Sequence, residues 1–172
     1  MRQIRRGVFE TNSSSTHSIC ISKEPVKHIP DSIHFSFGEY GWENDCVYDT
    51  ASYLYTAMYE LGMKDEIDGL KEILESRGIK CSFEQSKSAW DSGGVDHAGE
   101  LSNLIHDLLS DEEKLMRYLF GSSVIYTGND NCDENLDMCC CAEETIWDDD
   151  AQKMIPNPNY NPDVYDYYYK GN

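Results

Sequence analysis

Residues 47–61 read VYDTASYLYTAMYEL. Apolar side chains recur in this stretch near the spacing of one helix face, and Gly62 follows it as a stop signal. The pattern predicts a helix that buries a broad face of aliphatic and aromatic residues. The positions that make the pattern are Val47, Ala51, Leu54, Tyr55, Met58 and Leu61.

The chain before this helix predicts a loop followed by two strands. Residues 10–18 are small and polar without periodicity, which is typical of a loop. Residues 18–22 place Ile19 and Ile21 on one face of a short strand. Residues 32–37 alternate apolar and polar side chains, so we expect a second strand there.

The chain after the helix predicts three more helices and two more strands. Gly78 marks a helix end, Asp96 can cap a helix, and Ser110 with Glu113 forms a capping box. The predicted elements, in order, are a helix at 65–77, a strand at 79–84, a helix from Asp96 to Leu108, a helix from Asp111 to Phe120 and a strand at 122–127.

This element order predicts a single α+β domain over residues 1–172. The expected architecture is a mostly antiparallel sheet of about four strands with four helices, and the length suits one domain of about 150 residues. A Cys-rich acidic segment at 129–150 and a Tyr-rich tail at 156–172 follow the last predicted strand. The tail is too apolar for a disordered segment, so we expect it to pack back or to contact a partner.

The charge of the chain is strongly negative. The formal net charge is -18, from 32 acidic and 14 basic residues, while 40% of residues are apolar, which favours a folded protein over an acidic disordered tail. Such a charge repels nucleic acid and suits a partner with a basic surface, including a DNA-binding protein. The plainer alternative is a soluble acidic protein whose carboxylates only face solvent.

The C-terminal third contains an unusual cluster of cysteines. Cys132 is followed by the unbroken run Cys139, Cys140 and Cys141, and nine carboxylates with no Lys or Arg lie between Asp130 and Asp150. A negative field raises thiol pKa, whereas a bound cation deprotonates the thiols and offsets the charge. No apolar segment follows the N-terminal arginines and no apolar run approaches the ~20 residues of a membrane span, so we expect a cytoplasmic chain with reduced cysteines. The cluster therefore predicts a zinc site.

The remaining zinc ligand is open between a cysteine and a histidine. Cys139 and Cys141 share one side of an extended segment, Cys140 points the other way, and Cys132 can return through a loop. Among the histidines we favour His97 slightly over His17. Free cysteines are also common as small buried hydrophobes, which is the alternative to a metal site.

A catalytic role has less support in the sequence. Residues 13–16 place hydroxyl side chains beside His17, but no Gly-x-Ser-x-Gly elbow, phosphate-binding loop or dinucleotide fingerprint is present. Hydroxyl side chains in such a loop more often bond their own backbone. The enzyme hypothesis is a hydrolase or modifying enzyme that uses the polar blocks around His17, His97 and Asp130.

Four blocks of sequence carry a resemblance to known proteins. They are RRGVFETNSSSTHS at 5–18, FGEYGWE at 37–43, VDH at 95–97 and TGNDN at 127–131. With them the chain resembles a family of small proteins carried by phages and mobile elements of Firmicutes. Its size, acidity and cysteine cluster also look like those of the zinc-containing anti-CRISPR proteins.

The resemblance implies a function in the cytoplasm of a bacterial host. It implies a non-enzymatic inhibitor that binds a type II CRISPR effector nuclease with its guide RNA and reduces binding of target DNA, without itself binding nucleic acid. Such a nuclease holds its strands in a positively charged channel, which an acidic protein can occupy. The resemblance transfers no inhibitory residue, and a host-directed adaptor unrelated to CRISPR is a third hypothesis.

Overall fold

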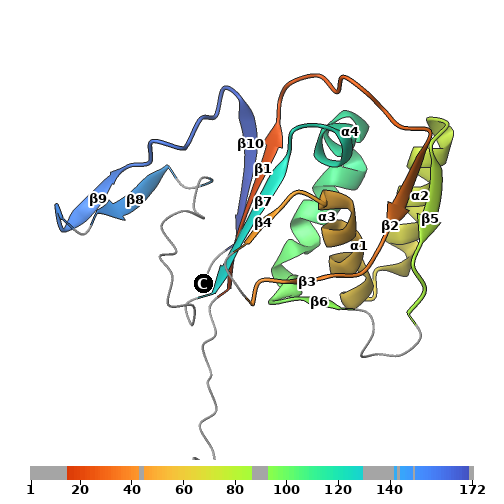
Figure 1. Ribbon diagram of the computed structural model, residues 1–172, viewed down its shortest axis with the longest axis horizontal. Coiled ribbons are helices and arrows are strands. Elements are labelled where there is room, and N and C mark those ends of the chain that lie inside the picture. The colour runs from red at the N-terminus through yellow and green to blue at the C-terminus, as the bar shows by residue number, and fades with distance from the viewer. Residues whose placement is uncertain are drawn as a thin grey trace, which may run out of the picture.

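A computed structural model describes residues 15–42, 45–86, 93–129, 142, 144–148 and 150–170 (Figure 1). These residues form an α+β structure with four α-helices on one side of a four-stranded antiparallel sheet. The element order predicts this class and this number of helices, and both are confirmed. None of the helices in these ranges is long and apolar enough to cross a lipid bilayer.

The sheet has the strand order β10-β1-β7-β4, and every neighbouring pair is antiparallel. At its centre Ile19 lies opposite both Ile125 and Tyr168, and Val47 also lies opposite Ile125. These side chains form the inner face that the helices cover. The strands are β1 (Ser15–Ser22), β4 (Asp45–Val47), β7 (Val124–Asn129) and β10 (Tyr165–Lys170).

Helix α1 (Thr50–Glu60) lies in the middle of the molecule. All positions from Thr50 to Met58 are buried, because the helix packs against the other helices and against strands outside the four-stranded sheet. A helix that is largely apolar around its circumference is stable only in such a place. The predicted helix is confirmed, although it begins after Val47, because that residue ends β4 and Asp49 caps the helix by accepting from Ser52 N–H at 3.1 Å.

The other predicted helices are also present. Leu70 and Leu74 bury one face of α2 (Lys64–Ser76). The helix predicted from Asp96 divides into a 3₁₀ turn (Ala98–Leu101) and α3 (Ser102–Ser110). The predicted Ser110 cap of α4 (Glu112–Phe120) is wrong: Asp111 caps it, and its Oδ1 accepts from Lys114 N–H at 3.0 Å.

Two predicted strands lie outside the main sheet. Strands β2 (Ser32–Phe35) and β5 (Lys80–Phe83) form a separate parallel pair against α1 and α2. Parallel strands need a long crossover, and α1 and α2 provide it here. Two further pairs are β3 (Glu39–Tyr40) with β6 (Gly94–Val95), and β8 (Thr145–Asp148) with β9 (Lys153–Pro156).

The Tyr-rich tail packs back onto the rest of the fold, which is one of the two arrangements expected from its composition. Strand β10 forms an edge of the sheet beside β1, and the Tyr168 hydroxyl donates to the carbonyl oxygen of Glu100. Asp166 also pairs with Lys23 at 3.5 Å and with Arg117 at 3.3 Å. The tail is therefore an integral part of the fold rather than an appendage.

Candidate functional site

The four sequence blocks meet at one end of β1. Residues 15–18 belong to β1 rather than to the predicted loop, and His17 lies opposite Thr127 of β7. The parallel pair of β3 and β6 brings residues 39–40 beside residues 94–95. The backbone of Asp96, just after β6, then reaches His17. Segments that are far apart in sequence thus converge on a single buried histidine.

The hydrogen bonds of His17 fix its proton. Its side chain is fully buried, with Nε2 3.1 Å from the Asp96 carbonyl oxygen and Nδ1 2.8 Å from the Tyr53 hydroxyl. A carbonyl oxygen only accepts, so Nε2 carries the hydrogen; in the neutral ring Nδ1 then accepts from Tyr53 O–H. The same carbonyl oxygen also accepts from the Ser15 hydroxyl at 3.2 Å.

A glycine permits the close approach of the blocks. Gly41 has φ of 98°, and a Cβ built on it would lie 2.8 Å from Nε2 of His17 and 3.0 Å from Cβ of Asp96. Glycine is thus required here both for its backbone conformation and for its lack of a side chain. Gly41 follows β3 in the sequence block FGEYGWE, at the point where the chain passes directly over His17.

The aromatic surroundings of His17 are kept neutral. Burial raises the pKa of Tyr53 well above its ordinary value, and burial followed by the charges of Asp49 and Asp45 raises the pKa of Tyr40 to about 12. The rings of Tyr40 and Tyr53 meet edge to face with centroids 5.2 Å apart. Tyr53 is therefore a hydrogen-bond donor to His17 at neutral pH and not a base.

This arrangement suits a structural histidine better than a catalytic or ligating one. Both ring nitrogens already serve protein groups, and no part of the side chain is exposed. A general base must reach a substrate proton, and a zinc ligand must give a nitrogen to the metal. His17 could do either only by breaking one of these two hydrogen bonds.

His97 lies beside this site but faces solvent. It occupies the left-handed region with φ of 55° at the start of the 3₁₀ turn, and its side chain is 37% exposed. Its Nε2 lies 3.9 Å from Oδ1 of Asp96. Of the predicted zinc ligands it is the one whose position the structure gives.

The cysteines of the predicted zinc site, Cys132 and Cys139 to Cys141, lie outside the described residues, as does Asp130. Within the described part of the chain, no three His, Cys, Asp or Glu side chains gather closely enough to hold a metal. The zinc prediction consequently stays a prediction.

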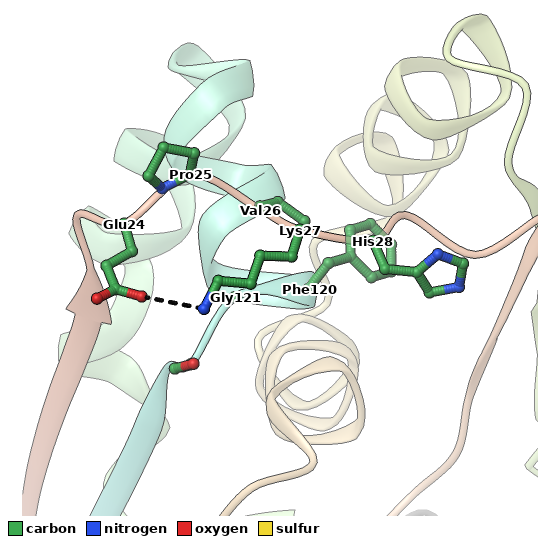
Figure 2. A pocket seen from close by; sticks show the side chains of 8 residues that line it. Glu24, Pro25, Val26, Lys27, His28, Phe120 and Gly121 are labelled. Carbon is green, nitrogen blue, oxygen red and sulfur yellow. Dashed lines mark ion pairs between the residues drawn. The ribbon is translucent and has the colours of Figure 1, made fainter.

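Two surface pockets lie on either side of the segment after β1. Figure 2 shows the first, of about 290 Å³, where Glu24 and Lys27 form an ion pair at 3.8 Å and His28 extends away from them. The second, of about 360 Å³, is lined by Lys23, Arg77 and Arg117, and each of these bases pairs with a carboxylate. The lysine and arginine side chains that line both pockets are thus held in ion pairs.

Sequence reasoning missed several residues at the β3–β6 pair. Glu60, near the end of α1, accepts from Val95 N–H through Oε2 at 2.7 Å. A Cβ built on Gly94 would lie 3.0 Å from the Trp42 ring, so this ring rests on the backbone of β6. No sequence motif marks these residues.

No family model, no curated protein and no solved structure matches this chain. Its function therefore has to be argued from its own residues.

Proposed function

We propose that this protein is a non-enzymatic inhibitor that binds a type II CRISPR effector nuclease and reduces the binding of target DNA. The observation that carries the proposal is the uneven distribution of charge over a chain of net charge -18. A protein that occupies a nucleic-acid channel needs a surface that replaces phosphate charge. A group of exposed carboxylates without a paired base at one end of the described residues supports the proposal.

Basic side chains lie mainly at the other end. Six bases form ion pairs with carboxylates in α2, in α4 and around β1 and β10. Helix α4 lies at the top of Figure 1, whereas β3 and β6 lie at the bottom. The paired bases are Lys23, Lys27, Lys71, Arg77, Lys114 and Arg117.

We name residues 37–42, 59–60, 83–86 and 93–101, around β3 and β6, the base-free end. It contains no Lys or Arg, and no described base pairs with any of its exposed carboxylates. Uncompensated charge of one sign gives a potential that steers a basic partner toward this end. The exposed carboxylates are Glu39, Glu60, Glu84 and Glu100.

The enzyme alternative has less support, because His17 is buried and both of its nitrogens bind protein groups. A titration separates the two hypotheses. Inhibition should saturate at about one protein per nuclease, as a binding equilibrium requires, with the mass of nuclease and guide RNA unchanged. Full inactivation at about one protein per hundred nucleases, or any covalent mass change, would overturn the proposal in favour of turnover.

The proposal includes zinc as a structural ion. Cys132, Cys139, Cys140, Cys141 and His97 are its candidate ligands, and bound zinc would stabilise the fold of the C-terminal region. Protein purified without chelator should contain about one zinc per chain. The double substitution Cys132→Ser with Cys139→Ser should release it and lower the Tm. Cys81→Ser is the matched control, because Cys81 lies outside the cysteine cluster and its thiol makes a long, weak hydrogen bond to the Ile79 carbonyl oxygen at 3.7 Å. Purified protein without any transition metal would refute this part.

A further inference from the structure

Two exposed aromatic rings of the base-free end are held rigidly. Trp42 is 50% exposed, and its ring lies against Gly94 of β6. Tyr59 is 41% exposed and meets the ring of Phe37 edge to face, with centroids 4.9 Å apart. Phe37 in turn stacks on the buried ring of Tyr55 at 4.9 Å. Ordered rings of this kind lose little entropy when a partner covers them.

Carboxylates are fixed beside the same rings. Glu60 follows Tyr59 in α1, and its Oε2, which accepts from Val95 N–H, lies beside Gly94, as the Trp42 ring does. Glu84 Oε2 accepts from Phe37 N–H at 2.9 Å. A carboxylate has two oxygens and several lone pairs, so each group keeps acceptor capacity for a ligand. The surface thus offers a flat aromatic face and an anchored negative charge together.

This combination fits the chemistry of arginine. A guanidinium group is planar, stacks on Trp and Tyr, and donates in a fork to a carboxylate, whereas an ammonium group is a compact, strongly hydrated point charge. Trp, Tyr and Arg are also the residues that dominate binding energy at protein interfaces. No Lys or Arg belongs to the base-free end, and no described base forms an ion pair with its exposed carboxylates.

We propose that Trp42, Tyr59, Glu60 and Glu84 form a docking surface for an arginine-bearing segment of a basic protein. The inference deepens the proposed function and rests on it for the identity of the partner, but the surface itself can be tested without the nuclease. It predicts a preference for arginine over lysine at equal charge, which general electrostatic attraction does not give.

The probes are two fluorescent peptides of alternating glycine with arginine or with lysine, titrated with the full chain. The arginine peptide should bind more tightly. The double substitution Trp42→Ala with Tyr59→Ala should weaken its binding about fivefold or more, the effect of two exposed cation–π contacts. Ile29→Ala with Met154→Ala is the matched control, since these side chains are 41% and 53% exposed outside the surface; binding should not change.

A second pair of variants tests the carboxylates. Glu60→Gln keeps an acceptor for Val95 N–H but loses the negative charge. It should therefore weaken binding of the arginine peptide more than Glu72→Gln on α2 does. Equal affinity for both peptides, or unchanged binding by the folded Trp42→Ala, Tyr59→Ala variant, would overturn the docking surface. Nuclease inhibition is measured in parallel. If peptide binding depends on these rings but the protein does not inhibit the nuclease, the docking surface is supported and the inhibitor function is rejected. If wild type and double variant inhibit the nuclease equally, the docking surface is rejected and the inhibitor function is retained.

Discussion

The imidazole of His17 satisfies two buried groups, the Tyr53 hydroxyl and the Asp96 carbonyl oxygen. His17→Ala should lower the free energy of unfolding by about 2–5 kcal/mol. The substitution leaves a cavity, and the Tyr53 hydroxyl and the Asp96 carbonyl oxygen each lose their hydrogen bond to the ring. The measurement is urea denaturation followed by circular dichroism. His34→Ala is the control: this histidine is exposed, its Nδ1 lies 2.9 Å from Ser82 Oγ, and its loss should cost less than about 0.5 kcal/mol.

Equal stability of wild type and His17→Ala would contradict the structural role. Loss of inhibition by a His17→Ala protein of unchanged stability would point the same way and would favour a chemical role for the ring. We expect instead that any loss of function follows the loss of folded protein.

The tyrosines near His17 give the fold a dependence on alkaline pH. Burial raises the pKa of Tyr40 from 10.0 to about 12, so between these values the folded chain holds a proton that the unfolded chain has lost. Stability is therefore complete below about pH 10 and falls as the pH rises toward 12. Tyr40→Phe should reduce this slope, measured as unfolding free energy against pH. Burial also raises the pKa of Tyr53 and Tyr118. Part of the pH dependence of stability should therefore remain in the Tyr40→Phe variant.

The β3–β6 pair depends on a glycine that approaches another backbone. Gly93 has φ of 61°, and a Cβ built on it would collide with the carbonyl oxygen of Gly38. Gly78 at the end of α2 has φ of 82° with nothing within 4 Å of its built Cβ. Gly78→Ala should thus cost only the left-handed strain, about 1–2 kcal/mol, and Gly93→Ala should cost more. Differential scanning calorimetry of both variants checks this; equal losses would show that the backbone contact is unimportant.

Periodicity and caps predicted the helices because those signals are local. The pairing of strands was less predictable: alternation in residues 32–37 and 79–84 indicates which face is buried but not which strand lies next to it. Strands β3 and β6 are two residues each, too short to show any period. Tyr and Asp residues in β10 conceal an edge strand whose neighbour, β1, lies at the opposite end of the chain.

The candidate site was predictable only in part for the same reason. The blocks around His17 and His97 stand out in sequence, yet the bond between His17 and Asp96 spans 79 residues and leaves no local signal. The loop expected at residues 10–18 hid the strand that buries His17. Tyr53 gives no sign of its role, because it looks like any other aromatic residue of a buried helix.

The described part of the molecule has two electrostatic ends, a compensated one around α4 and the base-free end around β3 and β6. In a chain of net charge -18 every exposed carboxylate repels the others, and this repulsion weakens with added salt. The Tm of the isolated protein should therefore rise with salt. A rise provides an internal control for binding experiments, since weaker binding at higher salt then cannot come from unfolding.

Association with the proposed nuclease should respond in the opposite direction. Screening over ~10 Å at 0.1 M salt reduces the attraction between a basic channel and the base-free end, so the association rate should fall as salt increases. Glu39→Lys and Glu72→Lys change the net charge equally, but only Glu39 lies in the base-free end. Glu39→Lys should slow association more than Glu72→Lys, with similar dissociation rates, in stopped-flow measurements. An association rate that is insensitive to salt and to Glu39→Lys would show that these carboxylates only face solvent.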